Sequence, residues 1–192
     1  MNKPSMKFIL KNRIWIVTQL PAFIMALILV YDPAQWEPFT TYSGYLAVSF
    51  LVLTLSLNPI KNLWAQWIWV LKLNRYRRQL GVASFSCALI HFTCFLIKRG
   101  SFYKAVPYFL HPAIIPAIGI AFPILLILAM TSNNYSVKKL SFPKWKKLHK
   151  TVYIAEVAVI THMILMGELV FALCFFIPLG ILQFSRYRKT MA

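Results

Sequence analysis

The sequence predicts an all-α membrane protein, a polytopic bundle of six transmembrane helices with both termini in the cytoplasm. Of its 192 residues, 59% are hydrophobic and only 13% are charged, whereas an average soluble domain carries roughly 25% charged residues. The apolar residues fall into six runs, each close to the ~20 residues that span a bilayer. The segments between the runs alternate between rich and poor in basic residues, which sets the orientation.

The six runs are residues 14–30, 42–57, 80–97, 113–130, 148–165 and 169–184. Four prolines lie inside them, and membrane helices tolerate such prolines with a kink: Pro21, Pro116, Pro123 and Pro178. We expect residues 1–192 to form a single domain. The first run follows a basic segment, as in a signal peptide, but we expect a retained anchor because no cleavage site of small residues precedes Tyr31.

The basic residues give the orientation of the predicted bundle. The N-terminal segment, the loops after the second and fourth runs and the C-terminal tail hold 18 Lys and Arg, against 3 in the other loops. The segments rich in basic residues are expected in the cytoplasm. Three acids, Asp32, Glu37 and Glu168, fall on the opposite side. The net charge of +17 therefore suits membrane lipid, and we expect no nucleic-acid partner.

Residues 61–76 do not form a clean span. Three tryptophans, Trp64, Trp67 and Trp69, are mixed with basic residues over this short segment. Tryptophan prefers the membrane–water interface, so we expect an interfacial segment on the cytoplasmic face. The alternative is an ordinary loop.

Two histidines lie deep inside apolar runs. His91 is 11 residues past Leu80 and His162 is 14 residues past Leu148, or about 16 Å and 21 Å along the respective helices. Both helices run outward, so the two rings reach similar depth. An imidazole in hydrocarbon is costly unless it binds something, and this pairing suits the two axial ligands of one haem iron. The alternative is two packing histidines bonded to neighbouring helices.

A second set of residues lies nearer the cytoplasm. His149 is 13 residues before His162, about 20 Å along the helix, and Arg77 and Arg78 occupy the same level, with Trp145 close by in sequence. Arginines there suit haem propionates, a flavin phosphate or lipid phosphate, and His149 suits iron or a ring carbonyl. This level is therefore a candidate site for a second haem, a flavin or a quinone.

Glu156 is the one acid inside an apolar run, and it follows His149 by seven residues. That spacing predicts a shared helix face. An intramembrane carboxylate is a functional candidate: it suits proton transfer, a bond to a histidine, or contact with a quinone. The alternative is a protonated, merely packed side chain.

Three further residues are weaker candidates. Cys87 and Cys94 share the face of His91 by spacing. They suit either thiolate ligation of iron or, as we favour, a surface of small residues, to which Ser84 and Ala88 add, that lets a flat macrocycle approach. The three cysteines form no CxxC pair. His111, beside Pro112, is expected to be an ordinary interfacial histidine.

At these residues the chain resembles a known family. The similar stretches lie within residues 42–167: SGYLAVSFLVLTLSLNPI, RRQLGVASFSCALIHF, HPAIIPAIG, AMTSNN and WKKLHKTVYIAEVAVITH. They resemble the MsrQ (YedZ) family, haem-binding membrane subunits of periplasmic methionine sulfoxide reductase systems, within the ferric-reductase-like transmembrane superfamily. Two positions depart from that pattern: His111 stands where an arginine is expected, and Glu156 where a small apolar residue is expected.

The resemblance implies a multi-pass protein of the bacterial inner membrane that holds one or two b-type haems. It implies that His91 and His162 ligate haem, with His149 a further ligand candidate, and that FMN or quinone is an additional cofactor candidate. Electrons would pass from a cytosolic flavin reductase or quinol to a periplasmic, MsrP-like molybdopterin methionine sulfoxide reductase. The chain has no GxGxxG stretch, so we do not expect it to oxidise NAD(P)H unaided; it would be a redox subunit whose partner reduces the substrate.

Two alternatives remain open from the sequence. One is another ferric-reductase-like membrane cytochrome b with a different acceptor. The other is a carrier or structural membrane protein whose histidines bind no haem.

Overall fold

Long apolar helices make up most of the chain in the computed structural model, which describes residues 6–191. Five helical stretches in this described part are long and apolar enough to cross a membrane. They are α1 (Met6–Tyr31), α2 (Trp36–Leu63), α4 (Arg77–Arg99), α8 (Phe142–His149) continued by α9 (Val152–Leu165), and α10 (Leu169–Met191). Each contains one predicted run and extends it. The predicted class, an all-α membrane helix bundle, is confirmed.

The run 113–130 is the exception among the six. It is helical only from Pro116, as a π-helix, η3 (Pro116–Ala121), followed by α6 (Phe122–Met130). The chain then bends by 97° into α7 (Asn134–Leu140), where the Asn133 side chain accepts a hydrogen bond from the Ser136 amide and so caps the new helix. The bundle therefore has five spans in its described part, or six if this bent pair counts as one.

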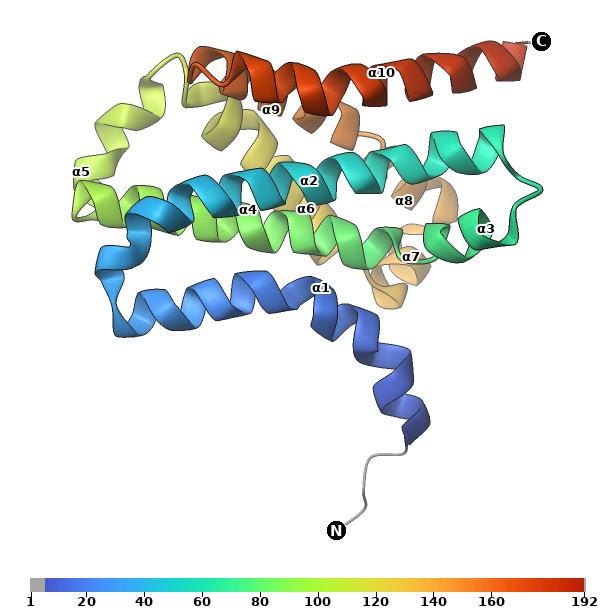
Figure 1. Ribbon diagram of the computed structural model, residues 1–192, viewed down its shortest axis with the longest axis horizontal. Helices are drawn as coiled ribbons and strands as arrows, with labels where there is room; N and C mark the ends of the chain where they lie inside the picture. Colours follow the sequence, from blue (N-terminus) through green and yellow to red (C-terminus); the bar gives the residue numbers. More distant parts are fainter. Residues whose placement is uncertain (1–5, 192) are drawn as a thin grey trace.

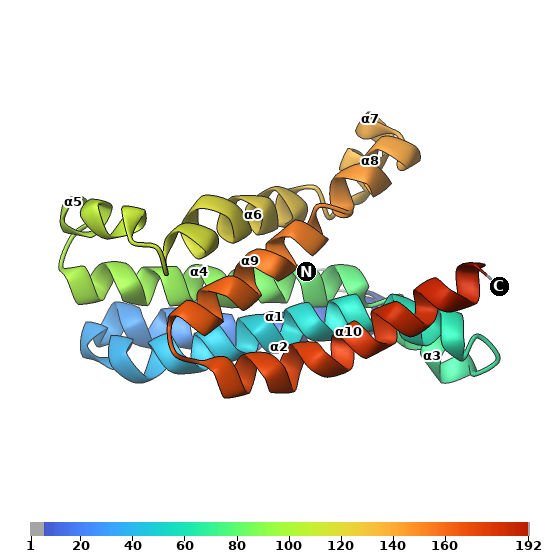
Figure 2. The same ribbon diagram turned by 90° about the horizontal axis from the view of Figure 1, so that it is seen from above.

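The short elements mark the two ends of the bundle (Figure 1). The 3₁₀ turn η1 (Pro33–Gln35), α5 (Phe102–Ala105) and the 3₁₀ turn η2 (Val106–Leu110) lie at one end. The other end holds α3 (Ile68–Asn74), α7 and α8, with α7 and α8 standing apart from α3 and the end of α10 (Figure 2). We refer to them as the α5 end and the α8 end. By the basic-residue pattern, the α8 end is the predicted cytoplasmic end.

Helix α2 is the centre of the packing. It packs along α4, where small side chains let the backbones approach and the Ser84 hydroxyl donates to the Ala47 carbonyl at 2.8 Å. Small residues and interhelical hydrogen bonds are the usual means of association in lipid, where the hydrophobic effect does not drive helices together. One buried cluster joins α2 to α6, α9 and α10, and a second joins α1, α2 and α4. Helices α4 and α9 are thus held on either side of a shared space.

The tryptophan segment forms the end of α2, a turn and the short α3. Trp64, Trp67 and Trp69 are all exposed and their rings contact one another in sequence, whereas Val70 is buried. Helix α3 is only seven residues long. The structure therefore gives a short helix with exposed aromatic rings at the α8 end, and its place in a membrane interface stays a prediction.

Candidate functional site

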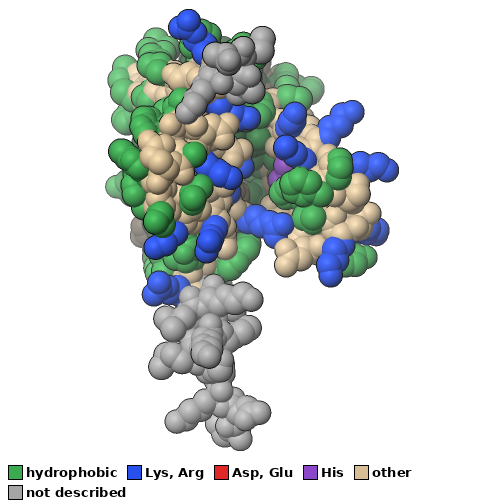
Figure 3. Space-filling view, turned by 90° about the vertical axis from the view of Figure 1, so that its right-hand side faces the viewer, with side chains coloured by type: hydrophobic (Ala, Val, Ile, Leu, Met, Phe, Trp, Pro, Cys, Tyr) green, Lys and Arg blue, Asp and Glu red, His purple; other side chains and the backbone are tan. Residues whose placement is uncertain are grey.

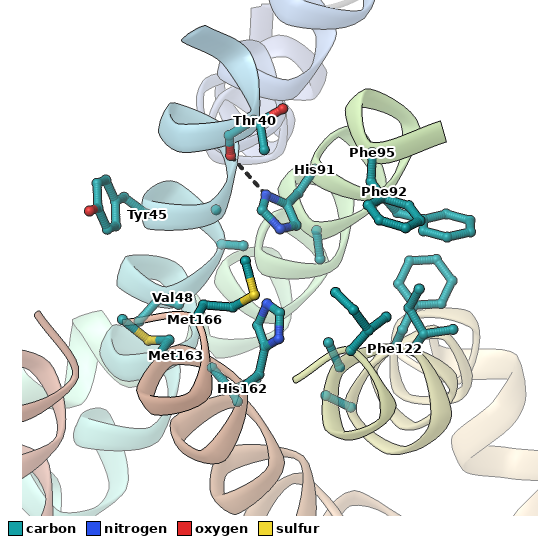
Figure 4. A pocket seen from close by; sticks show the side chains of 18 of the residues that line it. Thr40, Tyr45, Val48, His91, Phe92, Phe95, Phe122, His162, Met163 and Met166 are labelled. Carbon is teal, nitrogen blue, oxygen red and sulfur yellow. Dashed lines mark hydrogen bonds between the residues drawn. The ribbon is translucent and has the colours of Figure 1, made fainter. Parts of the chain in front are cut away.

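The structure brings His91 of α4 and His162 of α9 together. Their ring centroids are 6.4 Å apart and the ring planes are inclined at 79°. Figure 4 shows the two imidazoles pointing towards one another across a cavity. Two residues that are 71 positions apart in sequence thus form a facing pair.

Backbone carbonyls fix the orientation of both rings. His91 Nδ1 lies 2.8 Å from the Thr40 carbonyl oxygen, and His162 Nδ1 lies 2.6 Å from the Ala113 carbonyl oxygen. A carbonyl only accepts, so each Nδ1 carries the proton and donates, and each Nε2 keeps its lone pair. In the described part of the chain neither Nε2 has a hydrogen-bond partner. Both rings are therefore in the form that ligates a metal through Nε2.

The spacing of the pair fits one metal atom between two imidazoles. A metal–imidazole bond of about 2.0–2.1 Å, plus about 1.2 Å from Nε2 to the ring centre, places two ring centres roughly 6.4 Å apart. Among the described residues no group of three or more His, Cys, Asp or Glu side chains could hold a metal ion. Two facing imidazoles suit a metal whose remaining ligands come from a bound macrocycle, as those of haem iron do.

The space around the two rings is an apolar cavity of about 390 Å³. Phe92, Phe95 and Phe122 form one side in Figure 4, and Val48, Met163 and Met166 lie on the other. The backbone of Gly44 forms part of the wall directly against the His91 ring. Such a wall suits a flat, largely apolar ligand.

Two basic residues that the sequence analysis did not single out also line this cavity. Lys98 and Arg99 occupy the last turn of α4, at the α5 end. Seven residues make nearly two full helical turns, so the spacing from His91 to Lys98 already placed them on one face. The sequence therefore holds a signal for the pair in this spacing, which their position next to a loop obscures.

The predicted second site is assembled in part, at the α8 end. The Trp145 ring stacks on His149 with centroids 4.0 Å apart, and the Arg78 guanidinium lies 5.6 Å from the Trp145 ring. His149 Nε2 is 3.1 Å from the Thr131 hydroxyl. We call Arg78, Trp145 and His149 the α8-end cluster. Arg77 instead donates from Nε to the Thr54 carbonyl of α2 at 3.2 Å.

This end of the molecule is hollowed and strongly basic. Figure 3 shows Lys and Arg side chains on both sides of a furrow, with a histidine ring visible in it. The six lysines between residues 138 and 150, on α7, on α8 and just beyond, are all exposed. The furrow gives this end an opening towards solvent.

Glu156 and His149 contact different parts of the bundle. The buried Glu156 carboxylate accepts two hydrogen bonds from the Gln183 amide of α10, at 3.0 and 3.2 Å. Between α8 and α9, at residues 150–151, hydrogen bonds that span three residues occur beside one that spans four, so the winding differs locally from that of a regular α-helix. His149 instead contacts Trp145 and Thr131, and the predicted shared face of the two residues stays a prediction.

The cysteines and His111 lie outside the cavity wall. Cys87 and Cys94 are buried in the cluster that joins α4 to α1 and α2, and Ser84 and Ala88 present the small surface to the cavity instead. Of the predicted small-residue surface, Ser84 and Ala88 therefore line the cavity and the two cysteines do not. His111 is exposed, and its Nδ1 accepts a hydrogen bond from the Ala113 amide at 3.3 Å.

Comparison with known proteins identifies the family. Residues 43–160 match the family described as "Ferric reductase like transmembrane component". A "Protein-methionine-sulfoxide reductase heme-binding subunit MsrQ" from Herminiimonas arsenicoxydans is 32% identical over 165 residues, which cover 83% of this chain and 73% of that protein. The protein of the same name from Brucella ovis is 37% identical over 134 residues, 67% of this chain and 58% of its own length. The chain thus matches less than two thirds of the Brucella protein.

No solved structure matches the chain. The family match nevertheless covers α4 with His91 and most of α9, ending at residue 160, two positions before His162, and one relative matches over nearly three quarters of its length. The chain therefore belongs to the ferric-reductase-like transmembrane family and, within it, to the MsrQ family.

Proposed function

We propose that this protein is a haem b electron-transfer subunit of the bacterial inner membrane. It takes electrons from a cytosolic flavin reductase or from quinol and passes them to a periplasmic, MsrP-like molybdopterin methionine sulfoxide reductase. The observation that carries the proposal is the facing pair of His91 and His162, 6.4 Å apart with both Nε2 atoms free. The printed names of the relatives, which describe haem-binding subunits, support it.

The residues of the cavity would hold haem b as follows. His91 and His162 would hold the haem iron through their Nε2 atoms. The Thr40 and Ala113 carbonyls hold the two Nδ1–H groups, which fixes the ring orientations and raises the basicity of the ligating nitrogens. The phenylalanine and methionine walls exclude water. When bound, haem iron supplies the one-electron chemistry.

Electrons would enter at the α8-end cluster. Trp145 and His149 offer stacked rings, and Arg78 adds a cation within reach of the same rings. His149 Nε2 already contacts the Thr131 hydroxyl, and no second histidine lies within the cluster as the structure describes it. These contacts favour a planar organic ring with oxygen or phosphate groups, such as FMN or a quinone, over a second haem.

The chain acts in this proposal as a redox subunit, since substrate reduction belongs to the partner. An alternative is a membrane cytochrome b of the same superfamily with another acceptor. Capture of partners from native membranes, followed by an assay of haem reoxidation by each captured partner, separates the two. Reoxidation by a methionine sulfoxide reductase only when the sulfoxide is present supports the proposal.

The haem itself is tested by reduced-minus-oxidised spectra of the purified protein. We expect a low-spin haem b spectrum in the wild type. His91→Ala and His162→Ala should each abolish or strongly reduce it, because one axial ligand rarely preserves the same coordination. His111→Ala, which changes an exposed ring outside the cavity, is the matched control and should retain it. Full haem with unchanged spectra in both cavity variants would refute the pairing.

A further inference from the structure

Lys98 and Arg99 form a cationic edge on the cavity that contains His91 and His162. Both side chains line the cavity wall at the α5 end. Seven and eight residues from His91 correspond to about 10–12 Å along α4. The cations therefore lie beyond the histidine pair, to one side of it.

Aromatic rings hold both cations in place. The Arg99 guanidinium carbon is 3.5 Å from the centroid of the Tyr108 ring and 5.5 Å from that of Phe95. The Lys98 ammonium is 5.4 Å from the centroid of the Trp36 ring. Cation–π contacts of this kind orient a cation without neutralising it.

The anionic partner of this edge is missing from the described chain. Arg99 Nε is buried with no hydrogen-bond partner, and neither Lys98 nor Arg99 forms an ion pair among the described residues. The acid in the same wall, Glu168, accepts a hydrogen bond from the Tyr45 hydroxyl at 3.0 Å instead. A buried donor without a partner costs free energy, so the site calls for an acceptor from a ligand.

The arginines at the opposite end are already engaged by the protein. Arg77 donates to the Thr54 carbonyl, and Arg78 donates to the Asn134 side chain at 2.7 Å. Neither lines the cavity between the histidines. The sequence suggested this pair for propionates, but the unsatisfied cationic donor lies at the other end of α4.

We propose that Lys98 and Arg99 bind the two propionate carboxylates of the haem, so that the propionate edge of the ring faces the α5 end. This inference rests on the proposed haem between His91 and His162. Carboxylates would accept charge-assisted hydrogen bonds from both side chains. The propionate edge is then the part of the haem that lies closest to the predicted outer surface.

The experiment compares Lys98→Met and Arg99→Met with the wild-type holoprotein. Two quantities are measured: the rate of haem transfer to excess apomyoglobin and the haem midpoint potential. Loss of a charge-assisted hydrogen bond should accelerate haem transfer about tenfold or more. The midpoint potential should fall, because the removed cation no longer stabilises the reduced haem, which carries one more negative charge than the oxidised haem. The low-spin spectrum should remain, since both axial ligands are intact.

Lys104→Met is the matched control, because it removes one exposed positive charge at the same end but outside the cavity wall. It should leave the transfer rate unchanged. Arg78→Met tests the alternative, in which the propionates face the α8 end. If Arg78→Met accelerates haem transfer and Arg99→Met does not, the propionates face the α8 end and the inference is overturned.

Reconstitution with the dimethyl ester of haem separates propionate binding from a folding defect. The ester has no carboxylates, so wild type and Arg99→Met should release it at equal rates. A difference that persists with the ester means that Arg99 supports the fold and does not bind a propionate. A wild-type protein that binds no haem would instead refute the underlying function, which is a distinguishable outcome.

Discussion

Gly44 of α2 lies directly against the imidazole of His91: a Cβ atom at this position would stand 3.0 Å from His91 Nδ1 and 3.2 Å from Cε1. Contacts that short require the His91 ring or the helix backbone to shift. The same Nδ1 donates to the Thr40 carbonyl, one turn earlier on the same helix. Helix α2 therefore positions the histidine in two ways, by a hydrogen bond and by the absence of a side chain.

Gly44→Ala should disturb haem binding without touching a ligand. The added methyl group would push the His91 ring from its carbonyl, so we expect a lower haem-to-protein ratio and an altered low-spin spectrum. Gly81→Ala is the control, since its Cβ would meet only Thr54 at an ordinary 3.7 Å. Equal haem occupancy and identical spectra in the two variants would show that the His91 ring is not held as described.

Reporter fusions should establish the orientation of the bundle. The basic-residue asymmetry predicts that a reporter fused after Arg99 lies outside and one fused after Lys147 lies inside. Alkaline phosphatase and green fluorescent protein, which are active on opposite sides, give complementary readings. The reverse result would invert the proposed direction of electron flow.

The α8-end cluster should control electron input more than haem binding. His149→Ala and Arg78→Met each remove one group from the stack with Trp145. We expect slower haem reduction by the physiological donor in stopped-flow measurements, with haem content nearly unchanged. Dithionite, which needs no docking site, should reduce all proteins alike.

Tyr135→Phe is the control for this comparison, because it changes an exposed ring on the adjacent α7. If both cluster variants accept electrons as fast as the control does, the input site lies elsewhere.

The contact between Glu156 and Gln183 should stabilise the packing of α9 against α10. Interhelical hydrogen bonds in membrane proteins contribute about 0.6 kcal/mol on average and up to about 1.7. In a double-mutant cycle of Glu156→Leu and Gln183→Leu, we expect a coupling free energy of about 1 kcal/mol in detergent unfolding experiments. Strictly additive effects would mean that the pair contributes no net stability.

Hydropathy was sufficient to predict the helical membrane class and five of the spans. It could not show that the run 113–130 starts as a π-helix at Pro116 and ends in a 97° bend. Hydropathy averages over a window, whereas a proline and an asparagine cap act at single positions. The interruption at residues 150–151 was hidden in the same way.

Depth along a helix was predictable because the rise per residue is constant, and so the sequence could pair His91 with His162. The direction of a side chain around the helix is less certain. A local change in helical winding rotates every later residue, and the contact of Glu156 with Gln183 of α10 was not predicted from the sequence. The role of Lys98 and Arg99 was harder to predict, because it depends on which donors along the cavity wall the folded chain leaves without a partner.

The α8 end carries many exposed cations (Figure 3), whereas the four acids of the chain lie elsewhere, Asp32, Glu37 and Glu168 at the α5 end and Glu156 buried. An acidic soluble donor would be attracted over a distance set by the ionic strength, about 10 Å at 0.1 M salt. Its encounter rate should fall steeply as salt is added. A neutral quinol arriving through the bilayer feels no such attraction. The salt dependence of haem reduction therefore distinguishes the two classes of donor before either has been purified.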